Sequence, residues 1–561
     1  MALGSLTFVL HSHLPWVLHH GQWPHGAYWL HEAAAESYLP LWRVLHERRE
    51  RGSLGVTLGM SPVLCEQLAH PDFHREFVRY LEEKIAAAAA DRSAFAGEPE
   101  LAALANRWEQ FYRSTLEDFM GPHGVNIVAR LRRLEEVGAI EIVTCGATHG
   151  YLPLLASGAA IGGQVRTAVA SHRRHFGREP RGMWLPECAY RPATPVTPER
   201  PALAGIESVL AEHGLDYFFV DRHLLAGGTP LGVYADRFDA LRHLALDPAA
   251  GLTSNPRPPS RPYRVGPSGQ VAVFGRDART ASQVWSGEQG YPGDDVYLDF
   301  HKKRDPGGHR YWAVTHPKAS LADKRRYDPV AAAVRPLDHA RHFVALVHEV
   351  LNDAATHQAA PPIVCAMYDT ELFGHWWYEG PLFLAAVLDR CAESDIQLTT
   401  AGRHLQSHPP TEIVTLPEGS WGEGGRHDVW LNPQTAWTWP HVHSAERGFE
   451  RLAREAAARE GDPLLERLMR QTGRELLLLE ASDWQFLITT VSAREYAEGR
   501  ITGHADACAR LLALAAQRLS GGALSASDEH YLATIEKQDP LFPDFDWRRY
   551  PVDSGQPAPI A

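Results

Sequence analysis

Short apolar runs alternate along the chain with helix-like segments, and this alternation is the feature that most constrains the fold. The β-prone runs lie at 5–10, 55–58, 140–144, 182–185, 216–220, 363–367 and 397–400. Helix-like segments lie between them; Ser61-Pro62 is a typical helix start, and Gly138 and Gly214 are typical stops. This pattern predicts an α/β protein with a parallel sheet, open or closed into a barrel.

Three segments depart from the alternation. Residues 71–136 are helical in composition, so we expect a helical insertion there. Residues 222–269 are irregular and rich in proline, which is typical of a long active-site loop. The third segment carries amphipathic, strand-free stretches around 443–459, 462–480, 483–497 and 502–518. We therefore predict a barrel over 1–410, a C-terminal helical domain over 411–545 and a frayed tail over 546–561.

Composition excludes several classes of protein. The formal charge is −13, from 55 basic and 68 acidic residues, and no basic arm is present, so we expect no nucleic-acid partner. The first ten residues lack the features of a signal peptide, and no run of 18 apolar residues exists, so we expect no membrane partner. The six cysteines have no CxxC spacing, which is typical of reduced thiols in a cytoplasmic protein.

Polar, titratable side chains follow the predicted strands. They come directly after five separate apolar runs: His11 and His13, His149, Glu187, Asp221, and Asp369 with Glu371. Parallel α/β sheets and barrels build their active sites at the carboxyl ends of their strands. We therefore expect these residues to form one site.

Glu187 and Asp369 stand among aromatic residues, in Trp184-Leu-Pro-Glu187 and in Tyr368-Asp-Thr-Glu-Leu-Phe-Gly-His-Trp-Trp377. Two carboxyl groups in an aromatic cleft suit glycosidic chemistry, in which one acts as nucleophile or base and the other as acid. The alternative is structural, because an Asp at a strand end often caps the following helix or pairs with a cation. Glu371 is a rival for either chemical role.

The pair His11 and His13 also allows a metal site. Residues i and i+2 of a strand share one face, so with an Asp both rings can reach one Zn²⁺ ion, as in metal-dependent sugar deacetylases. Equally, the two imidazoles can bind sugar hydroxyls or the two carboxylates. The third strand-end histidine is His149, and no other ligand with tight spacing stands out.

At these residues the sequence resembles glycoside hydrolase family 57. The matching motifs, in order, are His11-Ser-His-Leu-Pro15, Gly146-Ala-Thr-His-Gly150, Trp184-Leu-Pro-Glu-Cys-Ala-Tyr190, Tyr368 to Trp377, and Ser482-Asp-Trp-Gln-Phe486. Within the family the chain is most similar to the 1,4-α-glucan branching enzymes. That similarity rests on Phe274 to Asp277, Gln283 to Asp294, Gly419 to Gly425 and Val429 to Asn432.

The resemblance implies an incomplete (β/α)7 barrel with a small helical insertion and a C-terminal helical domain. It implies Glu187 as nucleophile and Asp369 as general acid/base, with no metal and no cofactor. It also implies glucan-binding residues: His11, His13, His149, Arg276, Trp285, Gly293, Trp421, Trp430 and Asp483. A tyrosine on a mobile loop favours transfer in such enzymes; Tyr234 is the candidate here, and Tyr263 is its competitor.

The expected reaction cleaves an α-1,4 bond and forms an α-1,6 branch with net retention, acting on amylose, amylopectin or glycogen. Retention requires the two carboxyl groups to lie about 5 Å apart. Three alternatives stay open: an α-amylase or 4-α-glucanotransferase of the same family, a metal-dependent sugar deacetylase, and a non-catalytic glucan-binding protein. The first shares both carboxylates, so only the acceptor side separates it from a branching enzyme.

Overall fold

Parallel strands close into a ring at the centre of the molecule. The computed structural model describes residues 2–550 except 196–201, 228–237, 239, 242–243, 245–255, 268, 287–289, 317, 458 and 460. Within this part, seven strands run parallel in the order β8 (Ile363–Asp369), β1 (Gly4–Ser12), β2 (Val56–Met60), β3 (Ile140–Val143), β4 (Gly182–Met183), β5 (Tyr217–Val220) and β7 (Val271–Gly275). A bridge between Thr144 and Met183 joins β3 to β4. The N–H of Asp277 donates to the carbonyl of Cys365 at 3.0 Å, where β7 meets β8.

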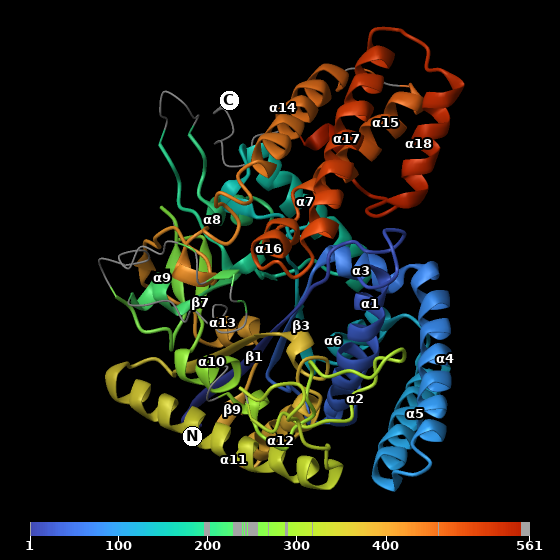
Figure 1. Cartoon of the computed structure of the whole chain (residues 1–561). Coiled ribbons are helices and arrows are strands. Elements are labelled where there is room, and N and C mark those ends of the chain that lie inside the picture. The colour runs from blue at the N-terminus through green and yellow to red at the C-terminus, as the bar shows by residue number, and fades with distance from the viewer. Residues whose placement is uncertain are drawn as a thin grey trace.

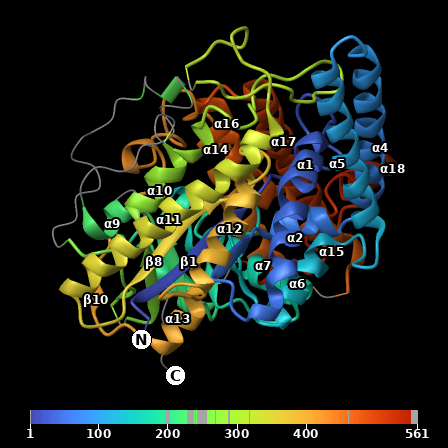
Figure 2. The ribbon, with the colours of Figure 1, turned by 90° about the horizontal axis from the view of Figure 1, so that it is seen from below.

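The strands form because their residues are apolar on both faces. Every residue of β1 and β2 is buried, as expected for a parallel sheet covered on both sides. Figure 2 shows β1 and β8 next to each other, and α11 (Pro329–His357) packs against both. The parallel α/β fold predicted from the alternation is therefore confirmed.

Helices surround the ring. They are α1 (Ala27–Ala33), α2 (Leu39–Arg48), α3 (Pro62–Ala69), α6 (Ile127–Glu136), α7 (Gly158–Phe176), α8 (Ile206–Glu212), α9 (Arg222–Ala226), α10 (Ala278–Trp285), α11, α12 (Gly380–Ala392) and α13 (Ala401–Ser407). Two further helices, α4 (Pro71–Ala94) and α5 (Pro99–Met120), pack on each other and stand at one side of the barrel (Figure 1). The expected insertion over 71–136 is therefore too long, because α6 packs against β3 and α7 and belongs to the helices around the ring.

Three shorter strands extend the sheet. β9 (Ile396–Leu398) pairs with β1, β6 (Tyr263–Val265) runs antiparallel to β7, and β10 (Ile413–Val414) pairs with β6. The expected loop over 222–269 therefore contains α9 and β6. Tyr263 is fully buried in β6 and donates its hydroxyl to the carbonyl of Pro258, so it is not a tyrosine on a loop over the site. Tyr234 lies outside the described residues.

The C-terminal part is helical. Its long helices are α14 (Thr438–Ala456), α15 (Pro463–Leu479), α17 (Arg494–Leu519) and α18 (Ala526–Gln538). Figure 1 shows them grouped above the barrel, with the short α16 (Asp483–Thr489) between the two parts. The expected helix over 483–497 is wrong in length, because Val491 takes a left-handed φ of 57° and separates α16 from α17.

Two of the expected boundaries need correction. Residues 413–414 pair with β6, so the sheet continues beyond residue 410. Trp547 and Tyr550 are each 1% exposed, so the chain is packed well past residue 546, where the tail was expected to begin. None of the described helices is long and apolar enough to cross a membrane.

Candidate functional site

The strand ends bring the predicted site residues together. β1 ends at Ser12, one residue before His13, and the register pairs His11 with Asp369 at the end of β8. His149 follows β3, and Glu187 follows β4 in a short turn, Pro186–Cys188. The expectation that these segments meet at one edge of the sheet is therefore confirmed by the strand pairing.

Glu187 is held by a tryptophan. The indole Nε1–H of Trp421 donates to Oε2 of Glu187 at 2.6 Å, and the backbone N–H of Trp421 donates to the Glu187 carbonyl at 3.0 Å. The other oxygen, Oε1, lies 4.0 Å from Nδ1 of His149, and the Glu187 side chain is 15% exposed. A charge-assisted bond of this kind orients the carboxylate and favours its ionised form.

The backbone at the site is unusual. Among the described residues, seven that are not glycine have a positive φ, and three of these are His149, Glu187 and Cys188, at 61°, 59° and 48°. The left-handed conformation costs about 1 kcal/mol or more for such residues, and surrounding packing must hold it. Strain gathered at one point of the fold is typical of a functional site.

Burial raises the pKa of the Glu187 carboxyl to about 8; the charges of Asp369 and Asp483 act in the same direction, and the Trp421 N–H opposes them. Near pH 7 this pKa keeps a proton on Glu187 in the free enzyme, while the Trp421 N–H favours the ionised form that a nucleophile needs. Double displacement on a sugar requires one carboxyl group as acid and one carboxylate as nucleophile.

Asp369 is not a helix cap. It stands at the N-cap position of the short turn Thr370–Leu372, yet its side chain makes no capping bond. Glu371 instead has a local role, since its Oε1 accepts from the Tyr38 hydroxyl at 2.5 Å and from the backbone N–H of His13 at 3.2 Å. Burial and the Asp369 charge raise the pKa of Glu371 to about 8.

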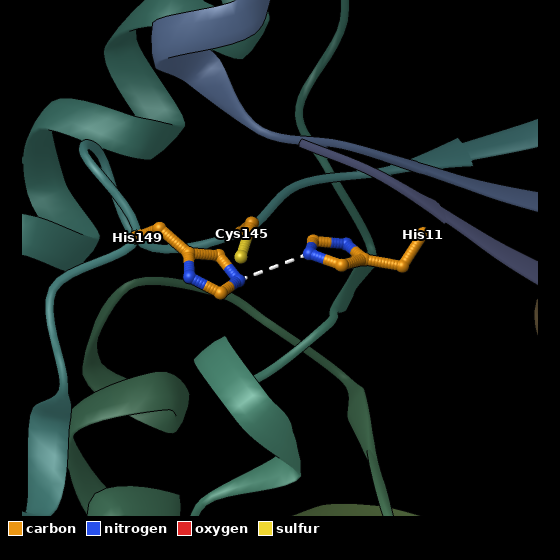
Figure 3. A group of neighbouring side chains, drawn as sticks. All are labelled: His11, Cys145 and His149. Atoms are coloured by element: carbon orange, nitrogen blue, oxygen red, sulfur yellow. Dashed lines mark hydrogen bonds between the residues drawn. The ribbon is translucent and has the colours of Figure 1, made fainter. Parts of the chain in front are cut away.

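The three histidines form one stack beside the carboxylates. His13 and His149 lie ring on ring at 3.9 Å, and His11 lies against the Trp184 ring at 4.9 Å. Figure 3 shows His11 and His149 pointing at each other, with their Nε2 atoms 3.0 Å apart. Burial holds the pKa of both His11 and His149 well below the ordinary value, so both are neutral.

The outer nitrogens of the stack are held by residues far apart in sequence. His13 donates from Nε2 to Asp483 at 3.0 Å, and its Nδ1 bonds the Ser61 hydroxyl at 2.9 Å. Nδ1 of His149 bonds the Ser482 hydroxyl at 2.8 Å. Ser61 is the predicted N-cap of α3, but its hydroxyl makes no capping bond there.

Two sets of side chains in the site place possible metal ligands within 4.8 Å of one another: His11, Cys145 and His149, and His13, His149 and Asp483. In the first set, the Nε2 atoms of His11 and His149 already bond each other at 3.0 Å, which occupies one ligand atom of each ring. In the second set the two rings are nearly parallel, at 12°, so no ion can lie in the plane of both. The arrangement favours sugar binding over the deacetylase alternative.

Arg276 joins the site from the end of β7. Its guanidinium lies 5.4 Å from the centre of the Trp421 ring and 3.8 Å from Asp221, and the side chain is 2% exposed. Burial opposes ionisation of Asp221, but His223 and Arg276 hold its pKa below the usual value. Arg276 therefore supports the tryptophan that holds Glu187.

The remaining predicted glucan-binding residues differ in accessibility. Trp285 ends α10 and is partly buried, with its ring 6.3 Å from that of Trp376; Gly293 lies in the short turn Tyr291–Gly293 and is partly exposed. Trp430 is 1% exposed because its ring stacks on Tyr151 at 4.3 Å. In this conformation Trp430 presents no face to a sugar, which corrects the expectation that its ring lines the acceptor groove.

Sequence reasoning missed Ser61, Tyr38 and Trp184 as supports of the site. Ser61 gave a misleading signal, because serine before proline is typical of a helix start. Ser482 was not predicted as a support either, although it stands next to Asp483 in the motif Ser482-Asp-Trp-Gln-Phe486, and this position could have indicated that it lies in the site.

The fold and the site together define a class of protein. A parallel barrel with two interacting carboxyl groups, a stack of imidazoles and buried tryptophans at its strand ends is typical of an enzyme that acts on carbohydrate. The profile of glycosyl hydrolase family 57 matches residues 7–417. The chain belongs to this family, which confirms the resemblance seen in its motifs. A second profile, for the C-terminal domain of 1,4-alpha-glucan branching enzymes, matches residues 441–550.

Individual relatives agree with the profiles. The chain is 40% identical to the 1,4-alpha-glucan branching enzyme of Thermococcus kodakarensis, over 89% of this chain and 72% of that protein. It is 32% identical to a probable 1,4-alpha-glucan branching enzyme of Mycobacterium tuberculosis, over 98% of both. Among solved structures, the branching enzyme of Pyrococcus horikoshii has a TM-score of 0.87 at 38% identity, and the match covers 100% of this chain and 98% of that structure. The α-amylase AmyC of Thermotoga maritima has a TM-score of 0.80 at 29% identity, and the match covers 98% of this chain and 99% of that structure.

Proposed function

We propose that the chain is a 1,4-α-glucan branching enzyme that acts on amylose, amylopectin or glycogen. The observation that carries this proposal is the C-terminal helical part. It matches the branching-enzyme profile, and the residues at the start of α16 bond the histidines of the barrel. The 40% identity to a branching enzyme supports the same substrate class.

In the proposed mechanism Glu187 attacks the anomeric carbon while Asp369 protonates the leaving oxygen, so a covalent glycosyl-enzyme forms. Asp369 then takes the proton from the 6-hydroxyl of an acceptor glucan. That oxygen attacks the same carbon and releases Glu187, which gives net retention. The Trp421 N–H stabilises Glu187 as an anion, and Nδ1 of the neutral His11, which has no partner among the described residues, can bond a sugar hydroxyl.

Transfer requires that an acceptor glucan outcompete water. Oriented groups reach effective molarities of about 10⁵ M or more, far above the concentration of water, so the acceptor must be held and water shut out. Trp285 is the partly buried tryptophan suited to hold it. Phe238 contacts Phe486 of α16 at 5.6 Å, and α16 begins at Asp483, so Phe238 lies near the site.

An α-amylase of the same family is the competing function. The similarity to AmyC supports it, because a branching enzyme and an amylase share this fold. The C-terminal profile and the higher identity favour branching. We also propose a cytoplasmic location, supported by six free buried cysteines, and a division into barrel and C-terminal helical domain near residue 414.

Proton NMR of amylose incubated with the protein tests the proposal, alongside an assay of reducing ends. We expect the α-1,6 anomeric signal to grow with few new reducing ends. Glu187→Gln, which keeps the shape of the side chain but removes the nucleophile, should abolish transfer and hydrolysis together, by about 10³-fold or more. An exposed control, Glu179→Gln, should retain activity.

New reducing ends without an α-1,6 signal would identify a hydrolase and overturn the branching proposal. Loss of all turnover in Glu187→Gln would exclude a non-catalytic glucan-binding protein. Turnover that survives in this variant would instead remove Glu187 from its proposed role.

A further inference from the structure

The loop that follows β1 is held from two sides. We call residues 13–18 the His13 loop, because His13 begins it. From the barrel, Gln67 of α3 accepts from the N–H of Val17 at 2.8 Å and donates to the carbonyls of Leu14 and Pro15 at 3.3 and 3.0 Å. Gln67 is fully buried, so these bonds face no competition from solvent.

From the other side the loop is held by Arg500, on α17 of the C-terminal part. Nη1 of Arg500 donates to the carbonyl of Trp16 at 2.6 Å and to the Tyr496 hydroxyl at 2.9 Å. The guanidinium lies over the Trp484 ring at 4.6 Å, and the side chain is 6% exposed. Arg500 is therefore held by hydrogen bonds in the plane of its guanidinium and by stacking on one face of it.

The two residues that Arg500 contacts, Trp16 and Trp484, each lie close in sequence to one partner of the His13–Asp483 bond in the site. Trp16 stands three residues after His13, and Trp484 directly follows Asp483. His13 and Asp483 bond each other at 3.0 Å. One guanidinium thus contacts a residue close in sequence to each partner of this bond.

A buried polar chain fixes Arg500 in turn. Nη2 of Arg500 donates to Nε2 of His504 at 3.0 Å, so His504 carries its proton on Nδ1 and donates to Glu475 at 2.7 Å. Glu475 also accepts from Gln471 at 2.9 Å. Asp539 and His20, bonded to each other at 2.7 Å, also face this cluster, and Arg474, Cys508 and Tyr531 lie within reach of the Glu475 charge.

The same bonds make a metal site here unsuitable. Ligand atoms of Glu475, His504 and Asp539 lie within 4.8 Å of one another. However, a metal on Nδ1 of His504 would move the proton to Nε2, where Arg500 already donates. The cluster is therefore complete as a hydrogen-bonded support of Arg500.

We propose that Arg500 is a positioning residue for the donor-sugar site, which sets the geometry of the His13–Asp483 contact from the C-terminal part of the chain. The proposal deepens the proposed function and rests on it for the substrate. It explains why the helical part must pack on the barrel before the row of histidines is complete.

Arg500→Lys tests the proposal, because lysine keeps the charge but cannot stack on Trp484 and bond Trp16 and His504 together. We expect kcat on amylose, counted as all glycosidic bonds cleaved, to fall about 10-fold or more, with KM changed little, as for a small misplacement at the reacting centre. The matched control is Arg510→Lys on the same helix, where the exposed Arg510 stacks on Tyr531; its kcat should stay at the wild-type value.

Rates are measured well below the unfolding midpoint of each variant, with folding checked by circular dichroism. If Arg500→Lys does not fold, Arg500→Gln takes its place. A folded variant of either kind with wild-type kcat and only a lower Tm would overturn the proposal, because that is the behaviour of a purely stabilising residue.

A double-mutant cycle with Asp483→Asn locates the effect. If Arg500 acts through the His13–Asp483 contact, the double variant should lose no more than about 2-fold beyond Asp483→Asn alone. Fully additive losses would overturn the proposal. Failure of the proposed function is a separate outcome, since wild-type protein would then cleave without forming α-1,6 bonds and the same kcat comparison would still decide the role of Arg500.

Discussion

Buried imidazoles link the stability of this chain to pH. His31, His172 and His404 are 1–3% exposed, and both ring nitrogens of each lack a hydrogen-bond partner among the described residues. Burial lowers their pKa values to about 4, 3 and 4. In the unfolded chain each has a pKa near 6.5, so the unfolded state binds more protons between about pH 4 and 6.5. Stability therefore falls as the pH is lowered through this window.

His31→Phe should weaken that dependence. His31 packs among Phe73, Phe77 and Tyr80, so a phenyl ring suits its surroundings. From pH 8 to pH 4.5 the variant should lose about 3 kcal/mol less unfolding free energy than wild type, by the linkage of a shift from 6.5 to 4. Urea unfolding at both pH values measures this difference. Parallel pH profiles of the two proteins would contradict it.

At the scale of elements, the turn after β8 fixes Asp369 and Glu371. The Ser37 hydroxyl donates to the carbonyls of Thr370 and Phe373, both at 2.8 Å. Gly374 follows with a φ of 109°, and a Cβ there would lie 1.8 Å from the carbonyl oxygen of Glu36. This close approach requires glycine, because the neighbouring atom belongs to the backbone and cannot move aside.

Gly374→Ala should therefore destabilise the protein by about 3 kcal/mol or more and lower activity, since overpacking adds to backbone strain. Gly214→Ala is the matched control, because Gly214 also has a positive φ, of 75°, but open space around it. The control should lose only about 1 kcal/mol. Measurements of Tm and of amylose turnover in the two variants test whether the close approach at Gly374 requires glycine. Equal losses would mean that the close approach in the turn does not matter.

On the scale of the whole molecule, the C-terminal helices complete the barrel's site. Ser482 donates its N–H to the His149 carbonyl at 3.1 Å, and Gln164 donates to Glu480 at 2.7 Å. The barrel and the helical part therefore share buried hydrogen bonds at the centre of the site, in contrast to domains joined by a small polar interface.

Because of this shared interior, the two parts should unfold together. Differential scanning calorimetry should give one heat-capacity peak, and loss of tryptophan fluorescence and of helical circular dichroism should coincide with it. Two separated transitions would mean that the C-terminal helices form an independent unit. Asp483→Asn, which weakens the contact between the parts, should lower the midpoint of the single transition.

The sequence by itself determined six of the seven ring strands, the placing of His11, His149, Glu187 and Asp369 at strand ends, and the family; β7 was not among the predicted strands. These features follow from local periodicity, turn residues and motifs, which each segment carries on its own. Loop boundaries and the ends of α16 and α17 were less predictable, since single left-handed residues such as Val491 interrupt helical composition.

Only the tertiary structure decided which side chains support the site and which are hidden. Ser61 bonds His13 rather than its own helix, Trp430 is covered by Tyr151, and Arg500 reaches Trp16 across 484 residues of sequence. Such contacts leave no local pattern, because they depend on how distant elements pack, and packing between elements is set by the whole fold.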